Sequence, residues 1–335
     1  MGPTPASTAS TTTVAENPIN ASVPSGTFVI TGANGGLGSA VVELIVSSSE
    51  FSSMHGIYMV REVDAATALN ASLNHAKQGH RYDVVGLDLS KLAGVRDVAK
   101  KINERVAGGS LPPIRALVLN AAFQCNYLAH WLLTMVLLQS MDREHGRIVV
   151  ISSAGHDPND TRHAGMGIFK EERWRTIRDD TTGAAGMRRY SAAKLCLVMM
   201  IYELQRRLSS DPVLSSICVL GLDPGAMSKE ILRRGNFLMS VFVTRIFLPF
   251  AAMVSSKLAP EGFFRITRKS AKHVLRVALD TETLGEHPQA VYLNGTKRWE
   301  SSAESRDEKK QMMLWQDSVK YTKLKASETV LSSWN

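Results

Sequence analysis

A glycine-rich loop between a strand pattern and a helix pattern constrains this chain more than any other feature. Thr27–Thr31 is a short run of strand-forming residues, and Leu37–Ser47 reads as a helix. Glycines let the loop between them turn tightly and approach a pyrophosphate, and the N–H groups at the helix N-terminus attract its charge. The alternative is a purely structural turn. We expect a dinucleotide site formed by Gly32, Asn34, Gly36, Leu37 and Gly38.

Strand and helix patterns continue to alternate after this loop. Continuous apolar runs such as Ala116–Leu119 are typical of strands buried on both faces. The alternation predicts an α/β fold with a Rossmann-type, doubly wound parallel sheet, helices on both faces, and a single domain. The other expected strands are Gly56–Val60, Tyr82–Leu87, Ile148–Ile151 and Ile217–Gly221, and the other expected helices are Asp64–Lys77, Lys91–Val106 and Arg188–Leu208.

Composition bounds the domain organisation. Residues 1–25 are rich in Ala, Ser, Thr and Pro and carry one charge, Glu16, so we interpret them as a disordered tail and not a secretory signal. The expected cofactor-binding domain covers 26–325 and includes a substrate loop at 154–187 and a lid at 226–265. A tail at 326–335 is expected to follow it. The three cysteines form no CxxC pair, so we expect no metal site and a reducing, cytoplasmic setting.

Charge and hydropathy narrow the choice of partners. The formal net charge is +8, but the basic residues are scattered and no aromatic residues interleave with them, so nucleic-acid binding is not expected. The apolar stretch 237–254 is interrupted by Arg245 and Pro249, which argues against a spanning helix. A substrate lid, a peripheral membrane contact and a subunit interface all stay open for it. The oligomeric state is not determined.

The glycine spacing identifies a resemblance. Gly32-x-x-x-Gly36-x-Gly38 resembles the short-chain dehydrogenase/reductase family, and the resemblance covers most of the chain. By that resemblance the following residues are further cofactor contacts: Asp88 and Leu89 after the third strand, Asn120 after the fourth, and the Pro224–Gly225 turn after the sixth. Ser228 follows that turn one residue earlier than the family pattern has it.

Arg61 indicates which dinucleotide binds. An acidic residue at the end of the second strand would accept a hydrogen bond from the ribose 2′-hydroxyl of NAD. This chain has Val60 followed by Arg61, whose guanidinium can instead bind a 2′-phosphate. The sequence therefore predicts NADP(H), with a solvated strand-end charge as the alternative.

Tyr190 and Lys194 form the predicted catalytic pair. Residues four apart share a helix face, and a cation about 4 Å from a phenol favours phenolate by about 4 kcal/mol, roughly three pKa units. Tyr190 could then exchange a proton with a substrate oxygen. The resemblance implies that Lys194 also holds the cofactor ribose and that Ser153, after the fifth strand, hydrogen-bonds the substrate oxygen.

Asn126 is the candidate for the family's fourth catalytic residue, and its position is unusual. Relatives carry a long loop and the first helical turns between the Asn-Ala-Gly segment and this asparagine, whereas here five residues separate Asn120 from Asn126. Either a real deletion has distorted the site, or the coding sequence omits an exon.

The expected activity is NADP(H)-dependent interconversion of a ketone and a secondary alcohol on a lipophilic small molecule. The C-terminal residues Gly295, Ser305, Arg306, Asp307, Leu314, Trp315 and Ser318 resemble the retinol dehydrogenase and protochlorophyllide reductase branch, and fungal secondary-metabolism reductases look similar. The alternative is a nucleotide-binding scaffold whose catalysis is impaired by the short Asn120–Asn126 segment. Substrate and direction are not determined.

Overall fold

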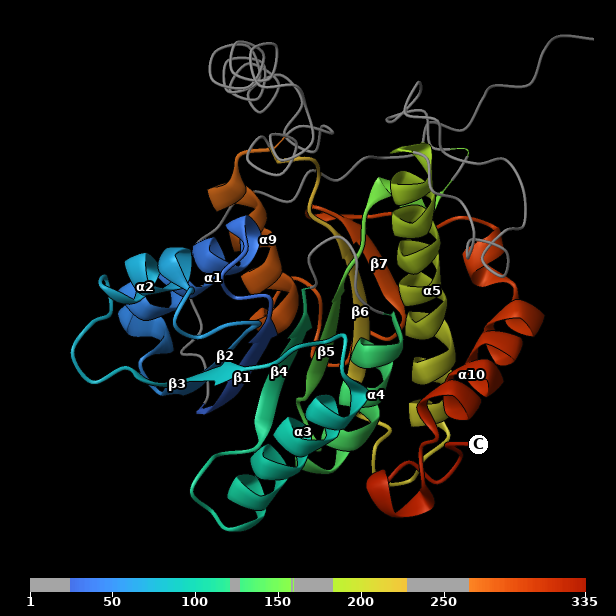
Figure 1. Ribbon diagram of the computed structural model, residues 1–335, viewed down its shortest axis with the longest axis horizontal. Coiled ribbons are helices and arrows are strands. Elements are labelled where there is room, and N and C mark those ends of the chain that lie inside the picture. Colours follow the sequence, from blue (N-terminus) through green and yellow to red (C-terminus); the bar gives the residue numbers. More distant parts are fainter. Residues whose placement is uncertain (1–24, 121–126, 158, 160–182, 228–264) are drawn as a thin grey trace, which may run out of the picture.

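One sheet of eight strands organises the chain. The computed structural model describes residues 25–120, 127–157, 159, 183–227 and 265–335. The strand order is β3-β2-β1-β4-β5-β6-β7-β8, and every neighbouring pair is parallel except β7 and β8 (Figure 1). The strands are β1 (Gly26–Thr31), β2 (Met54–Val60), β3 (Arg81–Gly86), β4 (Ile114–Leu119), β5 (Arg147–Ile151), β6 (Cys218–Asp223), β7 (Val291–Asn294) and β8 (Lys297–Arg298).

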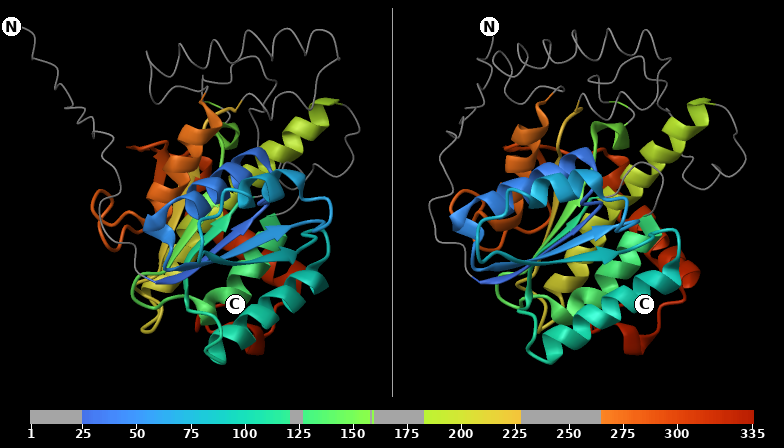
Figure 2. Two further views of the ribbon diagram at one scale, coloured as in Figure 1. Left: turned by 90° about the vertical axis from the view of Figure 1, so that its left-hand side faces the viewer. Right: turned by 60° about the vertical axis from the view of Figure 1, so that its left-hand side comes forward.

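Helices cover both faces of this sheet, as Figures 1 and 2 show. One face carries α1 (Gly36–Ser47), α2 (Thr67–Leu73) and α9 (Thr267–Leu279). The other carries α3 (Leu92–Ala107), α4 (Tyr127–Leu137), α5 (Gly183–Ser209) and α10 (Glu308–Thr322). Successive strand residues point to opposite faces, so Val29 packs with the α3–α4–α5–α10 core and Phe28 and Ile30 pack with the α1–α9 core. The predicted doubly wound, single-domain fold is confirmed.

The sequence patterns located the first six strands within a few residues of their observed bounds. The second helix is shorter than predicted, Thr67–Leu73 in place of Asp64–Lys77, because Arg61–Ala65 form an exposed loop before it. The patterns did not identify α4, β7, β8, α9 or α10. β7 has four residues and β8 two, so neither is long enough to give a periodic signal.

The last residues lie against the helical layer. We expected 326–335 to form a tail, yet Leu331 is buried and Trp334 O accepts a 2.8 Å hydrogen bond from Trp315 Nε1. Glu328 also pairs with Arg96 of α3 at 2.5 Å. This segment therefore packs on α3 and α10, because its apolar and acidic side chains find partners there.

Candidate active site

The predicted site residues gather at one edge of the sheet. β1, β4, β5 and β6 are adjacent and parallel, so their carboxyl ends bring Gly32, Asn120, Ser153 and Pro224 to the same edge. The chain runs outward from β1 to β3 on one side and from β4 to β7 on the other. The direction of the strand order therefore reverses between β1 and β4. Open α/β sheets bind ligands at such a switch point, beside the carboxyl ends of the strands.

The glycine loop fits a bound dinucleotide. Gly32 has φ +65°, and a β-carbon there would lie under 3.0 Å from the backbone oxygen of Asn120. A β-carbon on Gly38 would lie under 3.0 Å from Gly32 O and Ala33 Cα, whereas one on Gly36 would meet nothing within 4 Å. No side chain among the described residues caps the N-terminus of α1. Gly32 and Gly38 therefore shape the loop, and Gly36 leaves room for a phosphate.

Asn34, one of the expected cofactor contacts, makes hydrogen bonds within the protein. Its Oδ1 accepts hydrogen bonds from the backbone N–H groups of Ala68 and Leu69, at 2.9 and 3.0 Å. Its amide nitrogen donates to Ala65 O at 3.4 Å. The Asn34 side chain thus caps α2 and ties the glycine loop to the segment that follows β2.

Arg61 and Asp88 lie at the ends of neighbouring strands. Val60 pairs with Gly86, so Arg61 after β2 and Asp88 after β3 reach the same edge. Arg61 is exposed. Asp88 accepts hydrogen bonds from Ser90 N and Ser90 Oγ, at 3.0 and 2.7 Å, and these bonds hold the pKa of its carboxyl below the usual value. Leu89 is partly buried. Nothing acidic directly follows Val60, which suits a phosphate beside Arg61.

A buried network joins the glycine loop to the end of β4. Thr31 Oγ1 accepts a 2.9 Å hydrogen bond from Asn120 N and lies 3.0 Å from His130 Nε2. Asn120 Nδ2 donates to Gly32 O at 3.3 Å. The Thr31 hydroxyl thus links the end of β4 to His130 of α4. The sequence patterns assigned no role to Thr31 or His130. The sequence signal for each was a polar side chain in an otherwise apolar run.

Ser153, Tyr190 and Ser191 face one another around Gly155. Ser153 follows β5 and precedes the short 3-10 helix η3 (Ala154–His156). A β-carbon on Gly155 would lie 3.5 Å from the Tyr190 ring, 3.5 Å from Ser191 Oγ and 3.7 Å from Ser153 Oγ. Ser153 Oγ accepts a 3.2 Å hydrogen bond from Gly155 N, so its own proton is the one it can donate to a substrate oxygen.

Lys194 is buried next to this group. Its Nζ lies 5.7 Å from the centroid of the Tyr190 ring and donates a 2.6 Å hydrogen bond to Ile151 O at the end of β5. The burial of His130, and secondly the charge of Lys194, lower the pKa of His130 to about 3. The site thus keeps one buried cation and a neutral histidine beside it.

Hydrogen bonds fix the position of the Pro224–Gly225 turn. Ser270 Oγ donates to Pro224 O at 2.7 Å, and Gly225 N donates to Asp223 Oδ1 at 2.9 Å. The buried Arg265 donates to Asp223 O at 2.9 Å and hydrogen-bonds Asn294 at the end of β7. This turn therefore has a defined position beside the ends of β5 and β6.

Some predicted features lie outside the described residues: Asn126, Ser228, the apolar stretch 237–254 and most of the 154–187 loop. Within the described part of the chain, no three His, Cys, Asp or Glu side chains gather as metal ligands would. None of the helices described there is long and apolar enough to cross a bilayer.

Comparison with known proteins agrees with this geometry. The family profile described as short chain dehydrogenase matches residues 26–163. A short-chain dehydrogenase of Talaromyces variabilis, iccH, is 39% identical over 361 aligned positions, which cover 92% of this chain and 99% of that protein. Human retinol dehydrogenase 13 is 26% identical, over 92% of this chain and 88% of that protein.

The fold also resembles that of solved oxidoreductases. The crystal structure of NADPH-bound carbonyl reductase from chicken fatty liver superposes with a TM-score of 0.56 at 16% identity, covering 83% of this chain and 95% of that one. The alignment with iccH is longer than this chain, 361 positions against 335 residues, so iccH contains residues that this chain lacks.

Proposed function

The chain belongs to the short-chain dehydrogenase family of oxidoreductases, and on that premise we propose that it transfers hydride between NADP(H) and a lipophilic ketone or secondary alcohol. The observation that carries the proposal is the convergence of Ser153 and Tyr190 around Gly155, with Lys194 buried beside them. Tyr190 can exchange a proton, Lys194 is a cation that favours the ionised form of Tyr190, and Ser153 is a hydroxyl donor. All three lie at the ligand-binding edge of the sheet.

Each residue has one task in the proposed reaction. The bound nicotinamide supplies or accepts the hydride. Tyr190 gives a proton to the substrate oxygen during reduction and removes it during oxidation. Ser153 donates a hydrogen bond to the same oxygen and so stabilises the charge that develops on it. Lys194 keeps a positive charge beside the phenol, which lowers the cost of Tyr190 losing its proton.

The selectivity for NADP(H) is assigned to Arg61. Its exposed guanidinium, directly after β2, can bind a 2′-phosphate. The likeness to an NADPH-bound carbonyl reductase is compatible with this choice. We expect Arg61→Asp to invert the ratio of kcat/KM for NADPH and NADH, because a carboxylate repels the phosphate and accepts from the ribose hydroxyl. An unchanged ratio contradicts the role of Arg61.

The lipophilic substrate class is supported by the similarity to retinol dehydrogenase 13, whose named substrate is lipophilic. Incubating the purified chain with NADPH and a panel of hydrophobic ketones, while following nicotinamide absorbance, tests this directly. Tyr190→Phe is the matched variant, since it removes one oxygen atom. We expect it to abolish turnover and leave NADPH affinity within a few-fold. Full activity in Tyr190→Phe rules the mechanism out.

The second candidate is a nucleotide-binding scaffold with impaired catalysis. It is favoured by the short connection between β4, which ends at Leu119, and α4, which begins at Tyr127. The residues present in iccH and absent here are compatible with a deletion. This candidate predicts NADPH binding without turnover of any ketone in the panel. Sequencing the transcript separates a real deletion from an omitted exon.

A further inference from the structure

His156 is buried beside the proposed catalytic serine. It ends η3, three residues after Ser153, and only 3% of its surface is exposed. Its ring packs against Tyr292 of β7, with ring centroids 5.1 Å apart. His156 thus packs between the Ser153 turn and β7, and the reaction proposed above gives it no task.

Both ring nitrogens of His156 have backbone partners. Nδ1 lies 2.7 Å from Ser153 O, and Nε2 lies 3.2 Å from Ser302 N. The Ser302 N–H can only donate, so Nε2 must accept; the Ser153 carbonyl can only accept, so Nδ1 must carry the proton. The contacts therefore select one neutral tautomer. The Tyr292 hydroxyl lies farther from Nδ1, at 3.4 Å, and adds a weaker contact.

Ser302 belongs to a rigid C-terminal turn that is joined to α5. Ser302 Oγ accepts a 3.2 Å hydrogen bond from Ser305 N, and Ser305 Oγ donates to Ser302 O at 2.6 Å. Ser305 Oγ also lies 2.8 Å from Ser301 Oγ, which in turn lies 2.6 Å from the hydroxyl of Tyr202 on α5. Because α5 also carries Tyr190, this chain of hydrogen bonds connects the serine turn to the helix of the proposed proton donor.

We propose that His156 is a positioning residue that fixes Ser153 relative to Tyr190 by bridging the Ser153 carbonyl to the C-terminal turn at 301–305. The inference rests on the proposed function, since it assigns Ser153 to the substrate oxygen. It also gives Ser305, a residue of the C-terminal pattern noted in the sequence, a task at the active site.

Two amide substitutions separate the two bonds. The amide nitrogen of Asn reaches the place of Nδ1, whereas the amide of Gln reaches that of Nε2. His156→Asn keeps the bond to Ser153 O but loses the bond from Ser302 N, and His156→Gln does the reverse. Each variant breaks the bridge, so each should misplace the Ser153 hydroxyl and lower kcat about tenfold or more. The dissociation constant for NADPH should stay within about two-fold in both, because no cofactor contact changes.

The control and the contradicting results are equally specific. His55→Asn removes a comparable bond, the 2.7 Å contact with Asp83, far from the site, and should leave kcat unchanged. A native kcat in either the Asn or the Gln variant overturns the proposal. If His156→Gln fails to fold, Ser305→Ala serves in its place: it must lower kcat without weakening NADPH binding, and an unchanged kcat overturns the proposal.

One measurement is independent of turnover. Nitrogen-15 chemical shifts of the imidazole in the full native chain, assigned with the His156→Asn variant, should report the neutral form with the proton on Nδ1. A proton on Nε2 overturns the bridge. If the native chain reduces no ketone in the panel while the expected tautomer is present, the proposed function fails and the bridge remains.

Discussion

At the scale of single residues, the site is built around two buried basic groups that are not both charged. Lys194 is 6% exposed and its ammonium donates to Ile151 O. His130 is fully buried, and burial and Lys194 together lower its pKa to about 3. Because His130 stays neutral, Lys194 supplies the positive charge that these two groups place beside Tyr190.

Buried neutral histidines make the stability of the fold depend on pH. The pKa of His273 on α9 is also lowered to about 3, by burial first and then by Arg265, Lys269 and Arg276. In the unfolded chain each histidine binds a proton near pH 6.5, whereas the native state does not, so stability rises with pH between about 3 and 6.5. Each of these two histidines should lower the unfolding free energy by about 2 kcal/mol between pH 7 and pH 5.

Urea unfolding at half-unit pH intervals checks this prediction. His273→Gln should flatten the slope of stability against pH by about one proton between pH 5 and 6. His75→Gln, at an exposed position, is the control and should leave the slope as it was. An unaltered slope in His273→Gln means that this histidine titrates normally in the folded state.

Local pattern and resemblance located Tyr190, Lys194 and Ser153, because spacing on one helix and position after a strand are visible in the sequence. They could not locate His130 or His156. Each of these histidines acts through a partner distant in the chain, Thr31 in one case and Ser302 in the other. The bonds from Asn34 to α2 were missed in the same way, because its partners at 68 and 69 become neighbours only in the folded chain.

At the scale of elements, the glycine loop allows a matched pair of substitutions. A methyl group on Gly38 would strike the backbone of Gly32 and Ala33, so Gly38→Ala should destabilise the fold by about 1–3 kcal/mol. Gly36 has open space, so Gly36→Ala should keep or slightly raise the melting temperature. It should still weaken NADPH binding about tenfold or more, because the methyl group occupies the approach of the pyrophosphate.

Thermal melts and NADPH titrations of the two variants are read together. If Gly36→Ala binds NADPH with native affinity, the phosphates do not lie over this part of the loop. If Gly38→Ala is as stable as the native chain, the close packing of α1 on the loop is not required.

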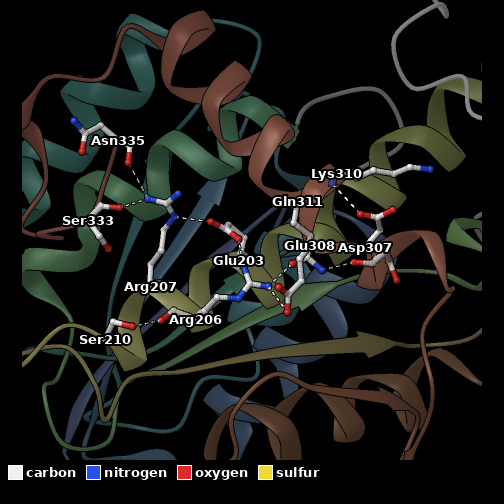
Figure 3. Close-up of polar contacts among 11 residues, drawn as sticks. Glu203, Arg206, Arg207, Ser210, Asp307, Glu308, Lys310, Gln311, Ser333 and Asn335 are labelled. Atoms are coloured by element: carbon white, nitrogen blue, oxygen red, sulfur yellow. Dashed lines mark hydrogen bonds and ion pairs between the residues drawn. The ribbon is translucent and has the colours of Figure 1, made fainter.

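Arginines of α5 contact α10 and the C-terminal residues, and both pair with one buried carboxylate, that of Glu203 (Figure 3). Glu203 is 5% exposed and pairs with Arg206 and, at 2.7 Å, with Arg207. The Arg207 guanidinium also lies 4.5 Å from the ring centre of Trp315 and hydrogen-bonds Ser333 O. Arg207→Met should therefore cost about 2–4 kcal/mol, since it leaves a buried charge with one partner.

Arg306→Met is the control for Arg207→Met, because it removes an ion pair that is exposed. Arg306 pairs with Glu300, but the two side chains are 43% and 73% exposed, so its loss should cost less than about 1 kcal/mol. Chemical denaturation of both variants measures the difference. Equal costs contradict the view that burial makes the Glu203 pair important.

The elements themselves were predictable in proportion to their length and apolar pattern. β4 and β5 are buried throughout, and each ends in an unbroken apolar run, Ala116–Leu119 and Ile148–Ile151. α10 has a mixed face, since Met312, Met313 and Tyr321 are exposed on it while Gln311 and Ser318 are buried, so its periodicity did not stand out. Its buried polar residues bond across to other elements, as Ser318 does to the Tyr127 hydroxyl at 2.7 Å.

At the scale of the whole molecule, the cofactor would join the two halves of the sheet. The proposed site takes its glycine loop from β1 and its catalytic residues from β5 and α5, on opposite sides of the switch point. A ligand that binds the native state alone stabilises it by about 2.7 kcal/mol at a hundred times its dissociation constant. For a chain of this length that corresponds to a rise in melting temperature of about 4 °C.

Binding and turnover must be measured on the same sample, because the enzyme and the scaffold differ only in chemistry. We expect NADPH to raise the melting temperature more than NADH at equal concentration, and Arg61→Asp to reverse that order. A shift accompanied by ketone reduction supports the enzyme. A shift without reduction of any ketone in the panel favours the scaffold. The short β4–α4 connection would then have abolished catalysis while nucleotide binding was kept. No shift with either nucleotide contradicts both, since each requires the loop at Gly32–Gly38 to hold a dinucleotide.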